Sequence, residues 1–199
     1  MAFAATQTKE EAKTKQSRLV VCVTGMPGAG KSTIAEVGQG LGYEVFRMGD
    51  DVRMEAEKRN VQPNDANLGA IMMELRQKSG PVAIARLCEQ RIEKDSKSKL
   101  IIIDGIRNVN EFIEFRKLGN ALLIAVHTSP LRRFNFLKER GRTDSPSDFK
   151  SFEARDRREL SVGVGEAIAL ADDILVNSGT LAELKTSAAK LLQTLKQSK

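Results

Sequence analysis

Short apolar runs alternate with longer stretches of helical periodicity along most of the chain. The apolar runs, which predict strands, cover residues 19–24, 44–47, 99–103, 121–127 and 173–176. Helical periodicity covers residues 31–41, 50–60, 66–79, 81–95, 108–118, 130–140, 149–162 and 180–196. The first run, Leu19–Val23, has no polar position, which is typical of a parallel strand covered by helices on both faces. The pattern therefore predicts an α/β fold with three layers (α/β/α) around a five-stranded parallel sheet.

A glycine-rich turn joins the first strand to the first helix and carries the most specific chemistry in the chain. It reads Gly25-x-x-x-x-Gly30-Lys31-Ser32, the phosphate-binding loop of P-loop NTPases. Glycine lets backbone amides curl around a phosphate chain, and the following helix points its first N–H groups at the same anion. In such a loop the lysine reaches the β- and γ-phosphates and the serine ligates Mg²⁺. The predicted ATP-binding residues of this loop are Gly25, Pro27, Gly28, Ala29, Gly30, Lys31, Ser32 and Thr33.

Length and composition indicate one domain preceded by a tail. The chain has 199 residues and no apolar stretch of membrane-spanning length, so no membrane partner is expected. Its two cysteines, Cys22 and Cys88, lack the spacing of a metal site or a disulfide framework, which favours a reduced, cytoplasmic protein. Residues 1–17 are polar and of mixed charge, so we expect a disordered tail there and a single P-loop domain at residues 18–199.

Most of the net charge of +6 is concentrated in one segment. Nine basic and five acidic residues lie between Leu131 and Arg158, and most of the basic ones are arginine. Arginine suits bidentate phosphate contact, whereas diffuse attraction to nucleic acid would be served equally by lysine. The distribution of charge therefore favours a small phosphorylated partner over nucleic acid.

A second segment with candidate chemistry ends the third predicted strand. The aliphatic run that begins after Lys99 ends in Asp104-Gly105, and Arg107 follows. In open α/β sheets, ligands bind at the carboxyl edge of the strands, where an acid can hold Mg²⁺ through water. We therefore predict a metal site made of Ser32 and Asp104.

A third segment, Met48–Arg53, follows the second predicted strand and brings acids and an arginine to the same edge. Two adjacent acids do not share one helical face, so we expect only one of Asp50 and Asp51 to act. We choose Asp50 because it directly follows Gly49. In this prediction Asp50 orients the phosphoryl acceptor, and Arg53 grips the phosphate that the acceptor carries.

These motifs together resemble those of nucleoside monophosphate kinases. Adenylate kinases have Thr-Gly-Asp-x-x-Arg and Asp-Gly-Phe-Pro-Arg where this chain has Met-Gly-Asp-x-x-Arg at 48–53 and Asp-Gly-Ile-Arg at 104–107. From Arg18 to its end, the chain is most similar to an archaeal family of P-loop kinases related to adenylate kinase. The stretch Arg-Asp-Arg-Arg-Glu-Leu-Ser-Val-Gly at 155–163 recurs in that family. Residues 171–180 resemble instead the adenine-binding loop of dephospho-CoA kinases.

The resemblance implies a role for each part of the chain. A helical insertion at about 49–97 would bind the acceptor, and an arginine-rich lid at about 140–158 would close over ATP. Asn177 and Gly179 would pack against the adenine. The residues implied to bind the acceptor are Gly49, Arg53, Gly105 and Arg107. The residues implied to act in catalysis are Lys31, Asp50, Arg140, Arg142, Arg155 and Arg158, with Arg157 as an alternative to Arg158.

The function expected from the sequence is phosphoryl transfer from Mg·ATP to a small phosphorylated acceptor, a nucleoside monophosphate. One alternative is dephospho-CoA kinase, which the loop at 171–180 favours. Another is an ATP-dependent switch that acts on RNA or a protein partner through the basic tail and the lid. The sequence leaves the base preference and the oligomeric state open.

Overall fold

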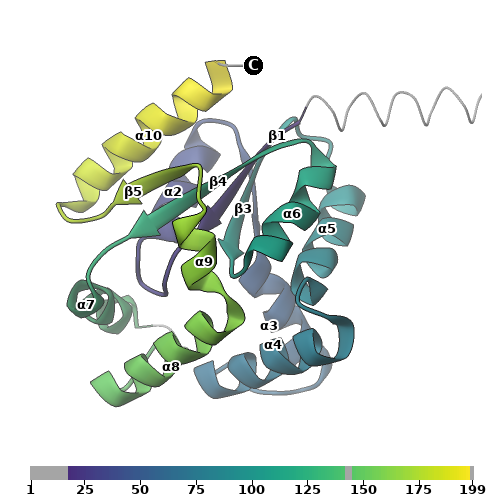
Figure 1. The fold of residues 1–199 in the computed structure, drawn as a ribbon, viewed down its shortest axis with the longest axis vertical. Helices are drawn as coiled ribbons and strands as arrows, with labels where there is room; N and C mark the ends of the chain where they lie inside the picture. The colour runs from purple at the N-terminus through teal and green to yellow at the C-terminus, as the bar shows by residue number, and fades with distance from the viewer. Residues whose placement is uncertain (1–17, 142–144, 198–199) are drawn as a thin grey trace, which may run out of the picture.

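All five strands run parallel and form one sheet in the order β2-β3-β1-β4-β5 (Figure 1). The computed structural model describes residues 18–141 and 145–197, so the tail expected at 1–17 lies outside the described residues. The strands are β1 (Leu19–Thr24), β2 (Glu44–Arg47), β3 (Leu100–Ile106), β4 (Asn120–His127) and β5 (Asp173–Val176). The predicted five-stranded parallel sheet and its three-layer fold are confirmed.

Both faces of the sheet are apolar, and helices cover both. On β1, Val20 and Cys22 belong to one hydrophobic core, whereas Leu19, Val21 and Val23 belong to the other. This alternation follows from the period of two in a strand, and it leaves every residue of β1 buried. The central strand, β1, is therefore packed against apolar side chains on both faces of the sheet.

Two helices cover one face of the sheet: α2 (Lys31–Gly40) and α10 (Leu181–Gln197). The helices on the other face are α3 (Met48–Lys58), α5 (Ala83–Asp95), α6 (Val109–Phe115) and α9 (Val164–Ala169). Three more lie beyond the end to which the strands point: α4 (Asp65–Ser79), α7 (Pro130–Arg140) and α8 (Phe149–Val162) (Figure 1). These three helices surround the edge at which the sequence places the chemistry.

Two element boundaries near that edge differ from the predictions. β3 continues to Ile106, because the register with β1 shifts at Val23/Thr24 and lets Gly105 bulge with a φ of 109°. The hydroxyl of Thr24 donates to the Ile106 carbonyl at 2.9 Å and fixes this bulge. In addition, α3 begins at Met48 rather than at residue 50, so the predicted turn is the first turn of the helix.

Two other predictions for the helices need correction. The helix predicted at 108–118 is α6 followed by a 3-10 turn over Arg116–Leu118. The short helix α9 was not predicted, because Gly163 ends α8 with a φ of 110° and the chain restarts as a helix at the next residue. Thr180 and Glu183 form a capping box before α10. Asn108 caps the Glu111 amide at the start of α6, and the Glu111 carboxylate accepts from the Arg107 amide.

The burial of β3, which lies between β2 and β1 in the sheet, gives a prediction about stability. Ile103 is fully buried, whereas Ile113 on α6 is 52% exposed. Replacing Ile103 by Ala removes buried methyl groups and leaves a cavity, which should lower the free energy of unfolding by about 2–5 kcal/mol. Ile113→Ala deletes the same atoms from the surface and should cost less than about 0.5 kcal/mol. Urea unfolding of both variants checks this, and equal losses would contradict the burial described here.

Candidate active site

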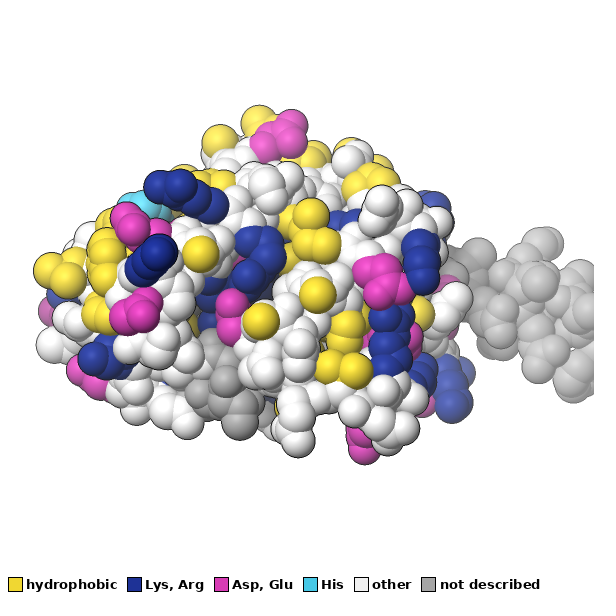
Figure 2. Space-filling view, turned by 90° about the horizontal axis from the view of Figure 1, so that it is seen from below, with side chains coloured by type: hydrophobic (Ala, Val, Ile, Leu, Met, Phe, Trp, Pro, Cys, Tyr) yellow, Lys and Arg dark blue, Asp and Glu magenta, His cyan; other side chains and the backbone are white. Residues whose placement is uncertain are grey.

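A cavity of about 740 Å³ lies at the carboxyl edge of the sheet, between α2, α3, α7, α8 and the loop before α10. Figure 2 views the molecule from that end, and Lys and Arg side chains gather near the middle of the face. Fifteen of the residues predicted for the site line this cavity: Pro27, Gly28, Gly30, Lys31, Ser32, Thr33, Gly49, Arg53, Asp104, Gly105, Arg107, Arg140, Arg155, Asn177 and Gly179. Gly25, Ala29, Asp50 and Arg158 are not among the lining residues, and Arg142 lies outside the described residues.

The phosphate-binding loop needs its glycines because neighbouring backbone lies close to them. A Cβ on Gly25 would lie 2.4 Å from the Val126 carbonyl oxygen, and one on Gly28 would lie 2.7 Å from the Arg133 carbonyl oxygen. Both glycines also have positive φ, at 139° and 79°. The loop is therefore fixed against β4 and α7 before any ligand binds.

Lys31 is buried against the loop that it follows. Its ammonium group donates to the carbonyl oxygens of Gly25 at 2.8 Å and Met26 at 3.1 Å. Burial first, and then the Arg107 and Arg155 cations, lower the pKa of the amine to about 7, although Asp104 and Glu159 act in the opposite direction. The negative charge of a bound phosphate chain would favour the protonated form of Lys31 and raise the pKa of its amine.

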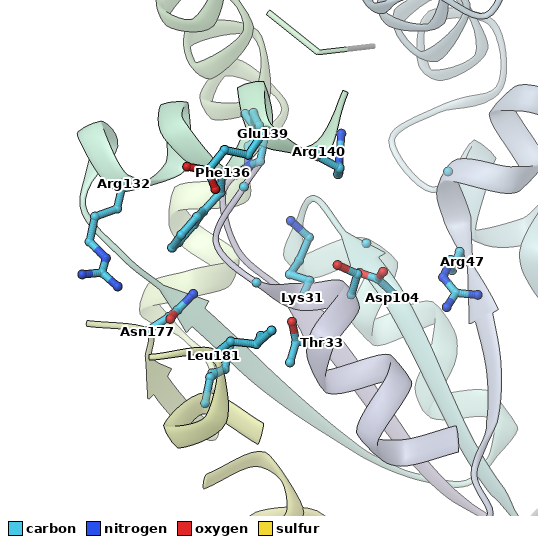
Figure 3. Close-up of a pocket in the computed structure, with 18 of the residues that line it drawn as sticks. Lys31, Thr33, Arg47, Asp104, Arg132, Phe136, Glu139, Arg140, Asn177 and Leu181 are labelled. Atoms are coloured by element: carbon cyan, nitrogen blue, oxygen red, sulfur yellow. The ribbon is translucent and has the colours of Figure 1, made fainter. Parts of the chain in front are cut away.

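Asp104 has the features expected of a residue that helps to hold a cation. It lies at the bulged end of β3 beside Gly105, and it lines the cavity close to Lys31 in Figure 3. Its Oδ1 atom is buried and, within residues 18–141 and 145–197, has no hydrogen-bond partner. Carboxylate and hydroxyl oxygens are ligands that Mg²⁺ prefers, so Asp104 and Ser32 fit the predicted metal site. The metal site remains a prediction.

The two adjacent acids at the start of α3 have different environments. Asp51 is buried and accepts two hydrogen bonds from Arg91, at 2.9 and 2.8 Å, so it ties α3 to α5. Asp50 is 43% exposed and pairs with Arg53 at 2.9 Å. Arg53 lines the cavity, whereas Asp50 does not. Asp50 therefore contacts Arg53, which lines the cavity, but does not line the cavity itself. Its predicted role toward the acceptor stays a prediction.

The opposite end of the cavity is apolar. Phe136, Leu137, Leu181 and Leu184 line it, and the Arg132 guanidinium lies 5.6 Å from the centre of the Phe136 ring. Arg132 also donates to the Gly179 carbonyl at 2.5 Å, so α7 is joined to the loop before α10. An aromatic ring beside aliphatic side chains suits the flat face of a nucleobase.

Asn177 holds the phosphate-binding loop at this end. Its side-chain amide donates to the Ala29 carbonyl at 3.0 Å, and its backbone N–H donates to the His127 carbonyl at 2.7 Å. Asn177 therefore lines the cavity and also supports the phosphate-binding loop through its hydrogen bond to Ala29 (Figure 3). Its predicted contact with adenine remains a prediction.

The charged segment of α8, residues 155–159, pairs with three other parts of the fold. Asp156 accepts two hydrogen bonds from Arg133, at 2.7 and 2.5 Å, and Arg133 also donates to the Pro27 carbonyl of the phosphate-binding loop. Arg158 donates to both carboxylate oxygens of Asp65 on α4, at 2.8 and 2.7 Å. The Arg158 guanidinium is thus paired with α4, and its predicted role at the transferring phosphate stays a prediction.

Two further contacts of α8 reach the site itself. Arg155 lines the cavity and lies 3.2 Å from the same Asp65 carboxylate. Glu159 is buried and forms an ion pair with Arg107 at 2.6 Å. Burial alone would raise the pKa of the Glu159 carboxyl, but Arg107, Arg155 and Lys31 together hold it below its usual value. Glu159 therefore remains ionised among these cations.

The lining or supporting residues that were not predicted from the sequence include Arg47, Arg132, Phe136, Asp65 and Glu159. A helical spacing of four links Arg132 to Phe136 and Arg155 to Glu159, which places each pair on one helix face. That spacing could have indicated these two pairs. Nothing near Asp65 in the sequence indicates its partners, which lie about ninety residues later.

Comparisons with other proteins place the chain in a family. A family model described as "AAA domain" matches residues 24–153. The UPF0200 protein of Hyperthermus butylicus is 39% identical over 178 residues, which cover 89% of this chain and 95% of that protein. The UPF0200 protein of Methanocaldococcus jannaschii is 40% identical over 178 residues, covering 89% and 90%. The chain belongs to the UPF0200 family. The archaeal family that the sequence resembled is thereby confirmed.

Solved structures similar to this UPF0200 chain share its fold at low identity. TT1252 from Thermus thermophilus gives a TM-score of 0.64 at 18% identity, covering 89% of this chain and 98% of that one. A gluconokinase from Sinorhizobium meliloti gives 0.56 at 15%, covering 92% and 96%. A shikimate kinase from Acinetobacter baumannii, in complex with shikimate, gives 0.55 at 14%, covering 92% and 94%. The UPF0200 chain therefore has the fold of P-loop kinases.

The close contacts of the UPF0200 glycines give a matched pair of variants. Gly28→Ala places a Cβ against the Arg133 backbone at a positive φ. Gly40→Ala, at the end of α2, places a Cβ that has no described atom within 4 Å apart from its chain neighbours and its own helix backbone. We expect Gly28→Ala to weaken ADP binding by about tenfold or more, because the loop must leave its anion-binding shape. Gly40→Ala should bind ADP as the wild type does. Calorimetric titration with ADP checks both, and equal affinities for the three proteins would contradict this account of the loop.

The lowered pKa of Lys31 gives a prediction about protons in the UPF0200 protein. Above pH 7 the free amine is mostly neutral, and a bound polyphosphate restores its charge, so binding should take up about one proton at pH 8. At pH 6 the amine is already charged, so this uptake should nearly vanish. Titration with ADP in two buffers of different ionisation enthalpy measures the uptake. Lys31→Arg, which does not titrate in this range, supplies the baseline for protons of the nucleotide itself, and an equal difference at both pH values would contradict the prediction.

Proposed function

We propose that this UPF0200 protein transfers the γ-phosphoryl group of Mg·ATP to the phosphate of a nucleoside monophosphate. The products would be ADP and a nucleoside diphosphate. The observation that carries the proposal is the arrangement of one cavity around the phosphate-binding loop. Figure 3 places Lys31 and Asp104 in its middle, Phe136 and Leu181 on one side, and Arg47 on the other. In this proposal, the apolar side takes a base, the middle takes the phosphate chain, and the side with Arg47 takes the acceptor.

The charge of the cavity supports an acceptor that brings its own phosphate. Seven cationic and two acidic side chains line it: Lys31, Arg47, Arg53, Arg107, Arg132, Arg140 and Arg155 against Asp104 and Glu139. Mg·ATP carries about two negative charges, and a phosphate monoester adds about two more. Asp50, Glu159 and Asp65 pair with Arg53, Arg107 and Arg155 from outside the lining, so part of this positive charge is already matched. An anionic acceptor would be held by bidentate arginine contacts, which suit a phosphate.

Residues from three elements converge on the cationic end. Arg47 ends β2, Arg53 lies on α3 and Arg107 follows β3, and all three line the cavity. Arg53 passes over Gly49, where a Cβ would lie 3.3 Å from its Nη1 atom, so the missing side chain leaves room for the guanidinium. The proposal assigns these arginines to the acceptor phosphate.

Catalysis in this proposal consists of positioning and neutralisation of charge. The loop amides and Lys31 would hold the donor phosphates, and Arg140 and Arg155 would approach the transferred group from the α7–α8 side. Mg²⁺, held by Ser32 and Asp104, would neutralise charge on the donor phosphates. Because water competes with the acceptor, closure of the arginine-rich segment would keep hydrolysis of ATP slow.

An assay of ADP release from Mg·ATP tests the proposal. The acceptors are AMP, CMP, UMP, GMP, dTMP, dephospho-CoA, shikimate and gluconate, and Lys31→Ala serves as the inactive control. We expect one or more monophosphates to raise turnover well above hydrolysis. Arg53→Met should raise the KM for that acceptor by about tenfold or more, because a charged hydrogen bond is lost, without changing the Kd of ATP. Arg116→Met, at an exposed position, is the matched control.

Each other outcome of the assay would overturn the proposal in a different way. A response to dephospho-CoA alone would make the acceptor group a ribose hydroxyl. A response to shikimate or gluconate alone would make the acceptor a hydroxy acid. No response to any acceptor, with ATP still bound, would favour an ATP-dependent switch that acts on a macromolecule.

A further inference from the structure

Glu159 is a buried carboxylate beside the cationic end of the cavity, and it belongs to neither group of residues discussed above for donor and acceptor. It is 5% exposed, and its Oε2 atom lies 2.6 Å from Nε of Arg107. A buried acid in such a place needs cationic neighbours, because an isolated charge there would cost several kcal/mol. Arg107, Arg155 and Lys31 supply them.

The end of α8 fixes the distance between Glu159 and Arg107. Gly163 follows α8, and a Cβ there would lie 3.1 Å from Cβ of Asn108 and 3.8 Å from the Arg107 carbonyl oxygen. This glycine therefore lets the helix end approach the turn after β3 closely. Glu159 lies one helical turn earlier, which brings its carboxylate to the Arg107 side chain.

The ion pair engages Nε of the Arg107 guanidinium. Nη1 is buried and has no hydrogen-bond partner among the residues that the structure describes. Nη1 lies 3.7 Å from where a Cβ on Gly105 would be, and Gly105 lines the cavity. The backbone N–H of Arg107 is also held, because it donates to Glu111 at 2.7 Å. Arg107 is thus fixed at its backbone and at Nε, with unused N–H groups at the strand end.

Buried N–H groups without partners are rare in folded proteins and call for an explanation. An anionic group of a ligand beside Gly105 would satisfy Nη1 of Arg107. The alternative, that Arg107 serves only to neutralise Glu159, leaves the orphaned Nη1 unexplained and places a costly ion pair in the core without a purpose.

We propose that Glu159 is a positioning residue, which holds the Arg107 guanidinium against Gly105 so that its free edge binds an anionic group of the acceptor. This inference rests on the proposed function for the identity of the acceptor. It does not rest on it for the binding of an anion, which can be measured without any transfer.

The test is a double-mutant cycle with Glu159→Gln and Arg107→Met in the full-length protein. Glu166→Gln, on the exposed face of α9, is the matched control. Inorganic phosphate is titrated into protein saturated with ADP. We expect Glu159→Gln and Arg107→Met each to weaken phosphate binding by about tenfold, since a charge-assisted contact is lost or misdirected. The Kd of ADP should stay within about threefold of the wild type.

The double mutant separates positioning from a structural role. If Glu159 acts through Arg107, Glu159→Gln has no further effect on phosphate binding once Arg107 is Met. Additive losses, or equal losses in ADP affinity and phosphate affinity, would overturn the inference. Failure of the wild type to bind phosphate would also overturn it.

The same variants separate this inference from the proposed function. With an active acceptor in hand, Glu159→Gln should raise the acceptor KM about tenfold and change the ATP Kd little. If no acceptor supports transfer, the proposed function fails, while the phosphate titration still decides the role of Glu159.

Discussion

Repulsion among cationic side chains at the carboxyl edge of the sheet is the constraint on which the rest of the structure depends. Five cations gather there from three helices and the turn after β3: Lys31, Arg107, Arg133, Arg155 and Arg158. Each like-charged neighbour raises the free energy of the others, the more so where water is excluded. Buried or partly buried carboxylates lie beside four of these cations and pair with the arginines. Helix α8 supplies charges of both signs, and its position is therefore set by its partners.

This arrangement has a cost as well as a use. Buried ion pairs often contribute little net stability, because desolvation offsets the attraction between the charges. Here these ion pairs fix the direction in which each arginine side chain points. Asp156 holds Arg133 so that it donates to the phosphate-binding loop, and Glu159 holds Arg107 at the end of β3. Apolar residues of the same size would pack α8 but would fix no guanidinium in the cavity.

Local features of the fold could be predicted from the sequence because they depend on neighbours in the chain. The glycine spacing of the loop, the apolar strand runs and the acid at the end of β3 each follow from a few adjacent residues. The pairing of Asp65 with Arg158 could not be predicted in this way, since it depends on how two helices ninety-three residues apart meet. The same holds for Asp51. The sequence shows two adjacent acids, and it does not indicate that Asp51 is buried against Arg91 while Asp50 is exposed.

Gly69 on α4 lies under the Arg158 side chain, where a Cβ would come within 2.8 Å of the guanidinium carbon. Helix α8 is thus seated on α4 at one point and on the phosphate-binding loop, through Arg133, at another. A helix held at both places cannot shift toward one ligand without altering the surroundings of the other. Under the proposed function, thermodynamic linkage would make the influence mutual: by whatever factor the donor changed the affinity for the acceptor, the acceptor would change the affinity for the donor.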